Sequence, residues 1–456
     1  MDLIDIEEFY LQLQDNVTIQ NKIVNFSKID LKHTKSISFN NCKFYRHLTI
    51  INSNPIEFID EIVTFENCSF TSFSFSKCNI NLLIIKNSVF ENEFSIKDSF
   101  FSGVRIESCL NINCEFRILS SIFKDSFWFS DNSFQETGKM VFIKNDFLEQ
   151  FTLMENTIHR LLFITNNFSN SAVLSYNNLS GFSSFDSCTF KKLDYSNSKI
   201  FSTRFNHCNF LNFANFAELE RIETSKLYFV SCEFNGLTSF NYSRLNILEI
   251  DKSTFDKATS FTNTEFNTIK LSEVKFDKGA YFDEMQLNKI IDKSFLKGSK
   301  KEISEWKKTL RTIKYEAQKL ENRIDFNQFR NYELAAHYKE LSFKNNFIDK
   351  TILWATKWSS DFGNWFWSLG FTILSGLIWY TILYRIENTS TFNFDQINNF
   401  FVGVFRFFLV TDFYNPLEND RTYLENGWSW LIFIIGKIFI AFGLYEMIQS
   451  FRKFKA

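Results

Sequence analysis

The chain has 456 residues, and its 50 Lys and Arg nearly balance its 52 Asp and Glu. A formal net charge of −2 gives no electrostatic reason to expect a nucleic-acid partner. The composition combines 60 Phe with only 2 Pro, and the length allows two or three domains.

Residues 1–36 precede any repeat, and we expect them to form an N-terminal cap. Residues 4–13 have the pattern of a short amphipathic helix. Stacked folds need such a terminal element, because their end repeats would otherwise expose the core. Residues 1–10 are acidic and lack the basic-then-apolar order of a signal peptide, so none is expected.

Residues 37–282 carry a large apolar residue at every fifth position, over several long runs. The runs are Phe65, Phe70, Phe75, Ile80, Ile85 and Phe90; Ile96, Phe101, Ile106 and Phe116, with Asn111 as a lapse; Phe185, Phe190, Tyr195, Ile200, Phe205 and Phe210; Phe240, Leu245, Ile250 and Phe255; and Phe261, Phe266, Leu271 and Phe276. This period fits neither an α-helix nor a flat strand, and its persistence predicts a solenoid. Residues 136–140 and 212–227 break the pattern and are expected to be loops.

Small residues hold a second fixed place, two positions before the large one. All eight Cys occupy it: Cys42, Cys68, Cys78, Cys109, Cys114, Cys188, Cys208 and Cys232. Five Asn share it: Asn132, Asn145, Asn156, Asn166 and Asn177. We expect the thiols to be buried rather than paired or bound to metal, because they are spread over many turns without a Cys-x-x-Cys pair. The Asn side chains are expected to form hydrogen-bonded ladders.

These features resemble the pentapeptide-repeat proteins, whose signature is a central Leu or Phe with a small residue two places before it. Residues 65–80 (FENCSFTSFSFSKCNI) and 185–210 (FDSCTFKKLDYSNSKIFSTRFNHCNF) carry the match in a Phe-rich form. The resemblance implies an all-β, right-handed quadrilateral β-helix, here with about eleven or twelve coils. Some members of that family mimic duplex DNA and bind topoisomerases, but this chain lacks the strongly acidic charge of a mimic.

Residues 283–345 change to a mixture of charged and apolar residues, which predicts an α-helical neck or linker. Residues 302–320 place their apolar side chains at helical spacing, with charges on the opposite face. Asp325 is expected to be the N-cap of a second helix over residues 326–341. The many basic residues could form a solvated helical face or attract anionic lipid head groups.

Residues 346–362 are expected to form an amphipathic helix at the membrane interface, because they combine an apolar stripe with two Trp. The final segment, residues 363–456, holds two apolar runs at 365–384 and 428–445, each long enough to cross a bilayer core of about 30 Å as a helix. Residues 398–410 between them are too short to span and predict a re-entrant or interfacial helix. The layout resembles the two-transmembrane, pore-loop architecture of the potassium-channel superfamily.

Basic residues near the two runs favour a cytoplasmic location of both termini. Lys339, Lys344, Lys350 and Lys357 precede the first run, and Arg452, Lys453 and Lys455 follow the second. The positive-inside rule therefore predicts a multi-pass protein of the cell inner (plasma) membrane, with membrane lipid as a partner. The repeat domain would lie in the cytoplasm, where thiols stay reduced.

The residues after the short apolar segment take the place of a selectivity filter. They read Thr411, Asp412, Phe413, Tyr414 and Asn415, so both glycines of the potassium-channel sequence TVGYG are missing. We therefore expect a filter that is not of the potassium type. In a tetramer, Thr411 and Asp412 could ring the mouth, and an acidic ring would favour cations.

Lys437 lies near the middle of the second run, where a charge is costly and commonly functional. Facing a pore it would favour anions, and facing a neighbour it could pair with Asp412 or Glu446. It could also merely snorkel or hydrogen-bond among the helices. Gly436 and Gly443 could permit hinge bending or close helix packing, and packing is the expected role.

The five His are scattered, and no phosphate-binding glycine loop, Gly-x-Ser-x-Gly or HExxH motif is present. We therefore expect neither an enzyme nor a resident metal or cofactor. The leading hypothesis is a homo-oligomeric, tetrameric ion channel or pore, gated by a cytoplasmic repeat domain that binds a protein or ligand. The alternative is a non-conducting, membrane-anchored scaffold that uses the β-helix for protein interactions.

Overall fold

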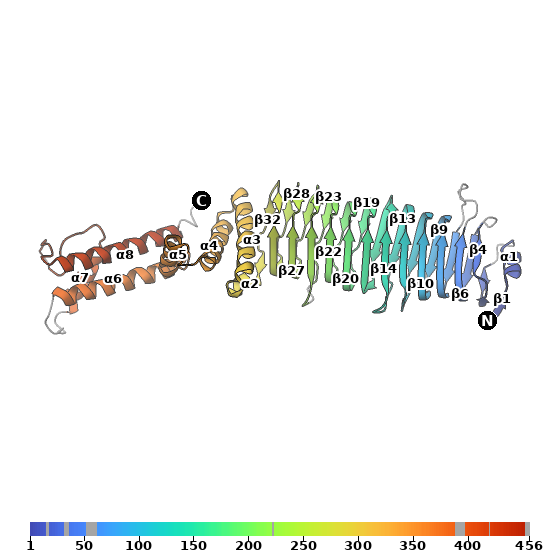
Figure 1. Ribbon diagram of the computed structural model, residues 1–456, viewed down its shortest axis with the longest axis horizontal. Helices are drawn as coiled ribbons and strands as arrows, with labels where there is room; N and C mark the ends of the chain where they lie inside the picture. Colours follow the sequence, from blue (N-terminus) through green and yellow to red (C-terminus); the bar gives the residue numbers. More distant parts are fainter. Residues whose placement is uncertain are drawn as a thin grey trace. The chain divides into compact units, whose positions relative to one another are not determined.

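The computed structural model describes residues 1–14, 18–31, 36–51, 62–220, 223–387, 397–418 and 420–451. These residues form two compact units that divide after Asp292. The first unit is a parallel β-solenoid of about 13 turns, and the second consists of the C-terminal helices (Figure 1).

Each turn of the solenoid supplies strands to two parallel sheets that run along the stack. The first sheet contains β1 (Asp2–Ile4), β3 (Lys22–Val24), β4 (Lys28–Asp30), β6 (Lys43–Ile51), β8 (Ser69–Ser76), β10 (Val89–Lys97), β12 (Glu115–Leu119), β14 (Lys139–Ile143), β17 (Thr157–Ile158), β18 (Arg160–Ile164), β20 (Asn178–Asp186), β22 (Lys199–Asn206), β24 (Lys226–Val230), β27 (Arg244–Asp251), β30 (Glu265–Ser272) and β33 (Gln286–Leu287). The second contains β2 (Ile19–Gln20), β5 (Ser36–Asn40), β7 (Ile62–Glu66), β9 (Asn79–Lys86), β11 (Phe100–Glu107), β13 (Ile122–Ser130), β15 (Asp146–Phe147), β16 (Gln150–Met154), β19 (Asn167–Val173), β21 (Thr189–Asp194), β23 (Asn209–Asn215), β25 (Glu233–Phe234), β26 (Leu237–Ser239), β28 (Thr254–Phe255), β29 (Thr259–Ser260), β31 (Lys275–Phe276) and β32 (Ala280–Tyr281).

The helices lie at the two ends of the chain. They are α1 (Ile6–Gln14), α2 (Asn288–Ile291), the 3-10 helix η1 (Ser294–Lys297), α3 (Lys300–Lys319), α4 (Arg323–Glu340), α5 (Phe347–Ser360), α6 (Trp365–Glu387), α7 (Ile397–Phe408) and α8 (Gly427–Phe451). The all-β repeat domain, the helical neck and two long apolar helices predicted from the sequence are confirmed.

The core of the solenoid is built from the residues of the five-residue pattern, stacked turn upon turn. Phe185, for example, is fully buried, and its ring stacks on Phe163 and Phe205 of the adjacent turns at centroid distances of 5.0 and 4.5 Å. Burying a Phe side chain contributes about 1.5–3 kcal/mol, so the repeated rings are a large share of the stabilisation.

Left-handed corners mark the repeat, one for every two five-residue units in this stretch. Asn67, Lys77 and Asn87 adopt left-handed conformations with φ of 55°, 53° and 47°, each directly before a small buried residue. A non-glycine residue in this conformation costs roughly 1–2 kcal/mol, an effect that Asn reduces by its local hydrogen bonding. The corner backbone is also hydrogen-bonded to the next turn, as in the 3.0 Å bond from the Asn67 N–H to the Lys86 carbonyl.

The predicted ladders and buried thiols are confirmed. The Asn132 amide nitrogen donates to Asn156 Oδ1 at 3.1 Å, and the Asn156 amide nitrogen donates to Asn177 Oδ1 at 3.2 Å. A second ladder joins Asn145 to Asn166 at 2.9 Å. All eight Cys are free and buried.

Three expectations about the repeat were wrong in detail. Asn111 does not replace an inward residue: it is an exposed left-handed corner (φ 57°), and Ile112 points inward instead. The segment expected as a loop at 136–140 already contains the start of β14, with Met140 buried. Over 212–227, β23 extends to Asn215 and β24 starts at Lys226, while residues 221–222 of that segment lie outside the described part of the chain.

The stack also begins earlier than expected, which gives about 13 turns rather than eleven or twelve. Ile19, Val24 and Ile29 are buried at five-residue spacing and lie in β2, β3 and β4. Aliphatic residues carry the pattern here in place of Phe. Helix α1 covers the first turn, with the buried Phe9 ring 4.8 Å from Phe26 and 5.8 Å from Phe39.

The neck is a helical hairpin formed by α3 and α4. A capping box between Ser299 and Glu302 starts α3. Glu333 of α4 pairs with Arg311 of α3 at 2.9 Å. The predicted N-cap of the second helix was wrong: Asn322 caps α4 by accepting from the Asp325 N–H at 3.2 Å, so the helix starts earlier and Asp325 lies in its first turn.

Candidate functional site

Helices α6 and α8 are long and apolar enough to cross a membrane. Their 23 and 25 residues correspond to about 35 and 38 Å, against a hydrocarbon core of about 30 Å. The two helices lie side by side (Figure 1). Small residues allow the close approach: a Cβ on Gly443 would lie 2.3 Å from Thr372 Oγ1.

Helix α7 is the short apolar helix between them, and at about 18 Å it cannot span. It packs on both long helices through the fully buried Phe407. The Phe407 ring lies 5.7 Å from Tyr380 of α6 and 5.6 Å from Phe433 of α8. Glycines make this possible, because a Cβ on Gly436 would lie 2.5 Å from Phe407 and a Cβ on Gly403 1.9 Å from the Tyr380 hydroxyl.

Lys437 is buried beneath the end of α7, with 5 % of its surface exposed. Its ammonium donates to the Leu409 carbonyl at 2.6 Å and lies 4.9 Å from the Phe433 ring centroid. A helix C-terminus carries partial negative charge, so this end of α7 stabilises a cation. In the part of the chain that the structure describes, Lys437 makes no ion pair with Asp412 or Glu446. Within one chain the ammonium is therefore hydrogen-bonded to the main chain, and the Asp412 carboxylate attracts it from beyond ion-pair distance.

The five residues in the place of a filter divide into two groups. Thr411 and Phe413 are exposed and Asp412 is half-buried, its Oδ1 accepting from the Tyr414 N–H at 3.1 Å. Asn415, by contrast, is buried and shapes the turn: its N–H donates to the Thr422 carbonyl at 2.8 Å. Tyr414 is half-buried like Asp412, and its ring lies 5.3 Å from that of Tyr423. The side chains available to a partner or to an aqueous path are therefore those of residues 411–414.

The structure brings Lys437, Gly436 and residues 409–412 together around the end of α7. Gly443 lies elsewhere, against the α6 residue Thr372. Gly403 was not singled out from the sequence, although a glycine inside a helix costs about 1 kcal/mol relative to Ala and so signals a packing need. The Leu409 carbonyl could not be predicted from the sequence as the acceptor for Lys437, because every residue has a main-chain carbonyl.

Two further observations bound the site. Among the described residues, no group of three or more His, Cys, Asp and Glu side chains could hold a metal ion. Arg452, Lys453 and Lys455, on which the predicted orientation partly depends, lie outside the described residues.

No family model, no curated protein and no solved structure matches the chain.

Proposed function

We propose that the protein is a homo-oligomeric membrane ion pore whose β-solenoid is a sensor domain of the pentapeptide-repeat type. The observation that carries the proposal is α7, a short apolar helix held against both long helices by Phe407, Gly403 and Gly436. If α7 lies at membrane depth, the non-helical turn that follows it must be enclosed by protein or line a water-filled path, because lipid offers its backbone no hydrogen-bond partners. Two helices that served as an anchor alone would need no such segment between them.

The proposed pore wall includes the exposed turn after α7. In a ring of subunits, Asp412 would form an acidic ring that favours cations. The Leu409 carbonyl is engaged by Lys437 and by the Asp412 N–H at 3.0 Å, so it is not free to replace the hydration shell of an ion. This supports a filter of side chains rather than a carbonyl filter of the potassium type, with Lys437 as the positioning residue that holds the turn.

The proposed location is the inner (plasma) membrane with both termini in the cytoplasm. The basic residues before α6 support this: Lys339 and Lys344 follow one another at the end of the neck, and Lys350 and Lys357 lie in α5. The eight buried free thiols agree with a reducing compartment for the solenoid. Binding of a protein or ligand to the solenoid would then reach α6 and α8 through α3, α4 and α5.

Ion flux through the purified full-length protein in liposomes tests the pore. We expect Asp412→Asn to lower the cation-to-anion permeability ratio while flux persists, because the acidic ring is lost. We expect Lys437→Met to change the flux itself, because the turn after α7 loses its anchor. Glu425→Gln is the matched control: it removes the same charge as Asp412→Asn from an exposed place before α8.

Either of two results would overturn the proposal. Folded oligomers without flux under an applied voltage would favour the membrane-anchored scaffold. An equal change in selectivity for Asp412→Asn and Glu425→Gln would show that residue 412 has no special place on the pore wall.

A further inference from the structure

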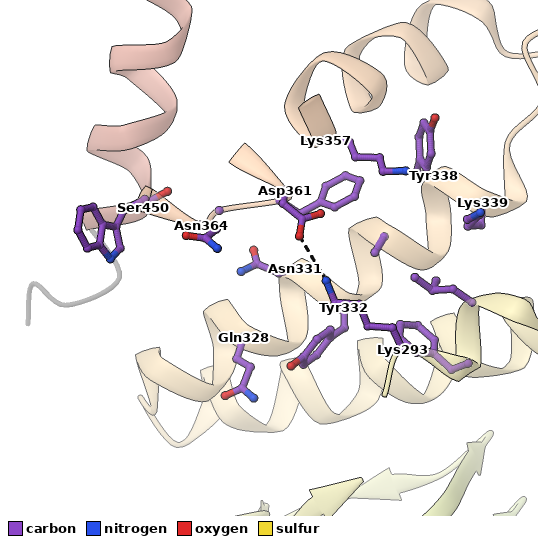
Figure 2. A pocket seen from close by; sticks show the side chains of 16 residues that line it. Lys293, Gln328, Asn331, Tyr332, Tyr338, Lys339, Lys357, Asp361, Asn364 and Ser450 are labelled. Atoms are coloured by element: carbon purple, nitrogen blue, oxygen red, sulfur yellow. Dashed lines mark hydrogen bonds and ion pairs between the residues drawn. The ribbon is translucent and has the colours of Figure 1, made fainter. Parts of the chain in front are cut away.

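A cavity of about 530 Å³ lies within the helical unit, where α4, the α5–α6 connection and the end of α8 meet (Figure 2). Its volume is within the usual range of ligand pockets, about 300–1,000 Å³. Asn331 and Tyr338 of α4, Lys357 of α5, Asn364 before α6 and Ser450 of α8 contribute to its walls. The cavity is therefore lined by the neck, by α5 and by both candidate membrane helices.

The walls carry an excess of positive charge. Lys293, Lys339 and Lys357 line the cavity, and the one carboxylate among the lining residues, Asp361, pairs with Lys293 at 3.3 Å. Lys339 and Lys357 make no ion pair with any residue that the structure describes. Lys357 instead lies 5.1 Å from the ring centroid of Tyr338.

A fourth lysine lies behind the wall and adds to this charge. Lys350 is buried, donates to the Tyr338 carbonyl, and lies 3.6 Å from the Tyr338 ring centroid. Burial and the charges of Lys339 and Lys357 lower the pKa of Lys350. Outside the lining, the Arg330 guanidinium attracts the Glu446 carboxylate. The cluster is therefore one that a bound anion would stabilise.

The lining also offers groups that suit an oxygen-rich anion. The side chains of Gln328, Asn331, Asn364 and Ser450 surround the cavity together with the lysines (Figure 2). Amide, hydroxyl and ammonium groups all donate hydrogen bonds, and a phosphate offers acceptor oxygens on every side.

The position of the cavity along the helices points to lipid head groups as the source of that anion. Helix α6 starts at Trp365, which lines the cavity, and α8 ends just after Ser450. Trp354, Trp358 and Trp365 have exposed side chains, and Trp is enriched at membrane interfaces. If α6 and α8 span the membrane, the cavity opens at the head-group level.

We propose that this cavity binds the phosphate group of an anionic ligand, with Lys339 and Lys357 as its principal cationic contacts. The bound ligand ties α4 and α5 to the ends of α6 and α8, so it regulates the proposed pore. Binding itself does not require conduction, and a direct binding measurement keeps the two proposals separate.

The experiment measures lipid binding to the full-length protein in nanodiscs of phosphatidylcholine containing a trace of labelled phosphatidylglycerol. We expect Lys339→Gln with Lys357→Gln to weaken binding by at least about tenfold, since the phosphate loses its charge-assisted hydrogen bonds to both ammonium groups. Lys339→Arg with Lys357→Arg should restore it. The matched control is Lys308→Gln with Lys344→Gln, which removes the same charge from exposed places outside the cavity and should change binding less than about twofold.

A second arm separates the two sources of phosphate. Inorganic pyrophosphate that displaces the labelled lipid from the wild type, with the same dependence on Lys339 and Lys357, would identify a soluble ligand for the same site. Equal losses in the cavity variant and in its control would show general surface attraction and overturn the proposal. Unchanged binding in the cavity variant would overturn it as well.

Discussion

At the scale of single residues, Lys437 shows how a costly side chain can be stabilised by the main chain. Its cation is placed at the C-terminal end of α7, on the Leu409 carbonyl, and among the Phe433 and Phe407 rings. The sequence marked Lys437 as a candidate, since a lysine within an apolar run is rare. It could not name the acceptor, because any residue type supplies a carbonyl and only the fold determines which one is within reach.

The thiols provide a prediction at the same scale. Burial raises the pKa of Cys109 and of Cys114 to about 12, and all eight thiols are buried. The thiolate is the reactive form, so these two thiols stay unreactive at pH 8, and burial shields all eight from the reagent. We therefore expect no alkylation of the native protein by iodoacetamide at pH 8, and eight labels after denaturation. Mass spectrometry of the intact protein counts the labels. Rapid labelling of a native thiol would show that the corners open in solution.

At the scale of elements, the sequence predicts a repeat better than it predicts its phase. Every fifth residue marked the core because each corner turns the chain after a fixed number of residues. Asn111 was misassigned because an additional left-handed corner shifts the pattern by one, and no residue type is unique to such a corner. Likewise, Asn322 and Asp325 are both good caps, and only the hydrogen bond from the Asp325 N–H distinguishes them.

The contact between α7 and the long helices gives a prediction for glycine. In Gly436→Ala, the new Cβ would lie 2.5 Å from Phe407 and 2.8 Å from Trp379, so we expect a loss of about 1–3 kcal/mol of stability. Gly370→Ala is the control, because no atom lies within 4 Å of its Cβ position. Denaturant titration of the detergent-solubilised protein compares them. Equal stability of the two variants would mean that α7 does not pack as described.

At the scale of the whole molecule, the lysine-lined cavity illustrates what a linear pattern leaves out. Lys293, Lys339 and Lys357 come from three separate segments, and the sequence supported only a general basic character of the neck. Their convergence depends on how α4 packs on α5 and on the α5–α6 connection. The solenoid is the opposite case, since each of its turns contacts its neighbours and the local pattern is enough.

Because each turn of the solenoid contacts only its neighbours, a substitution at the end of the stack should destabilise the nearest turns alone. Phe9→Asp places a charge in a fully buried position over the first turn, at a local cost of about 3–5 kcal/mol. We expect faster amide hydrogen exchange in residues 18–31 and 36–51, with β18 to β24 unchanged. Leu11→Asp on the exposed face of α1 is the control, because Leu11 is 65 % exposed. Faster exchange throughout the solenoid would instead indicate one cooperative unit.

The hydrogen bond between Lys437 and Leu409 has an electrical consequence. A charge moved across a membrane potential performs work of about 2.3 kcal/mol per 100 mV. If α8 spans a bilayer, the Lys437 ammonium lies within that field, so an opening motion of the proposed pore that shifts it along the membrane normal would be voltage-dependent. In the proposed ring of subunits these contributions would add. The cation that anchors the turn would then also serve as a gating charge.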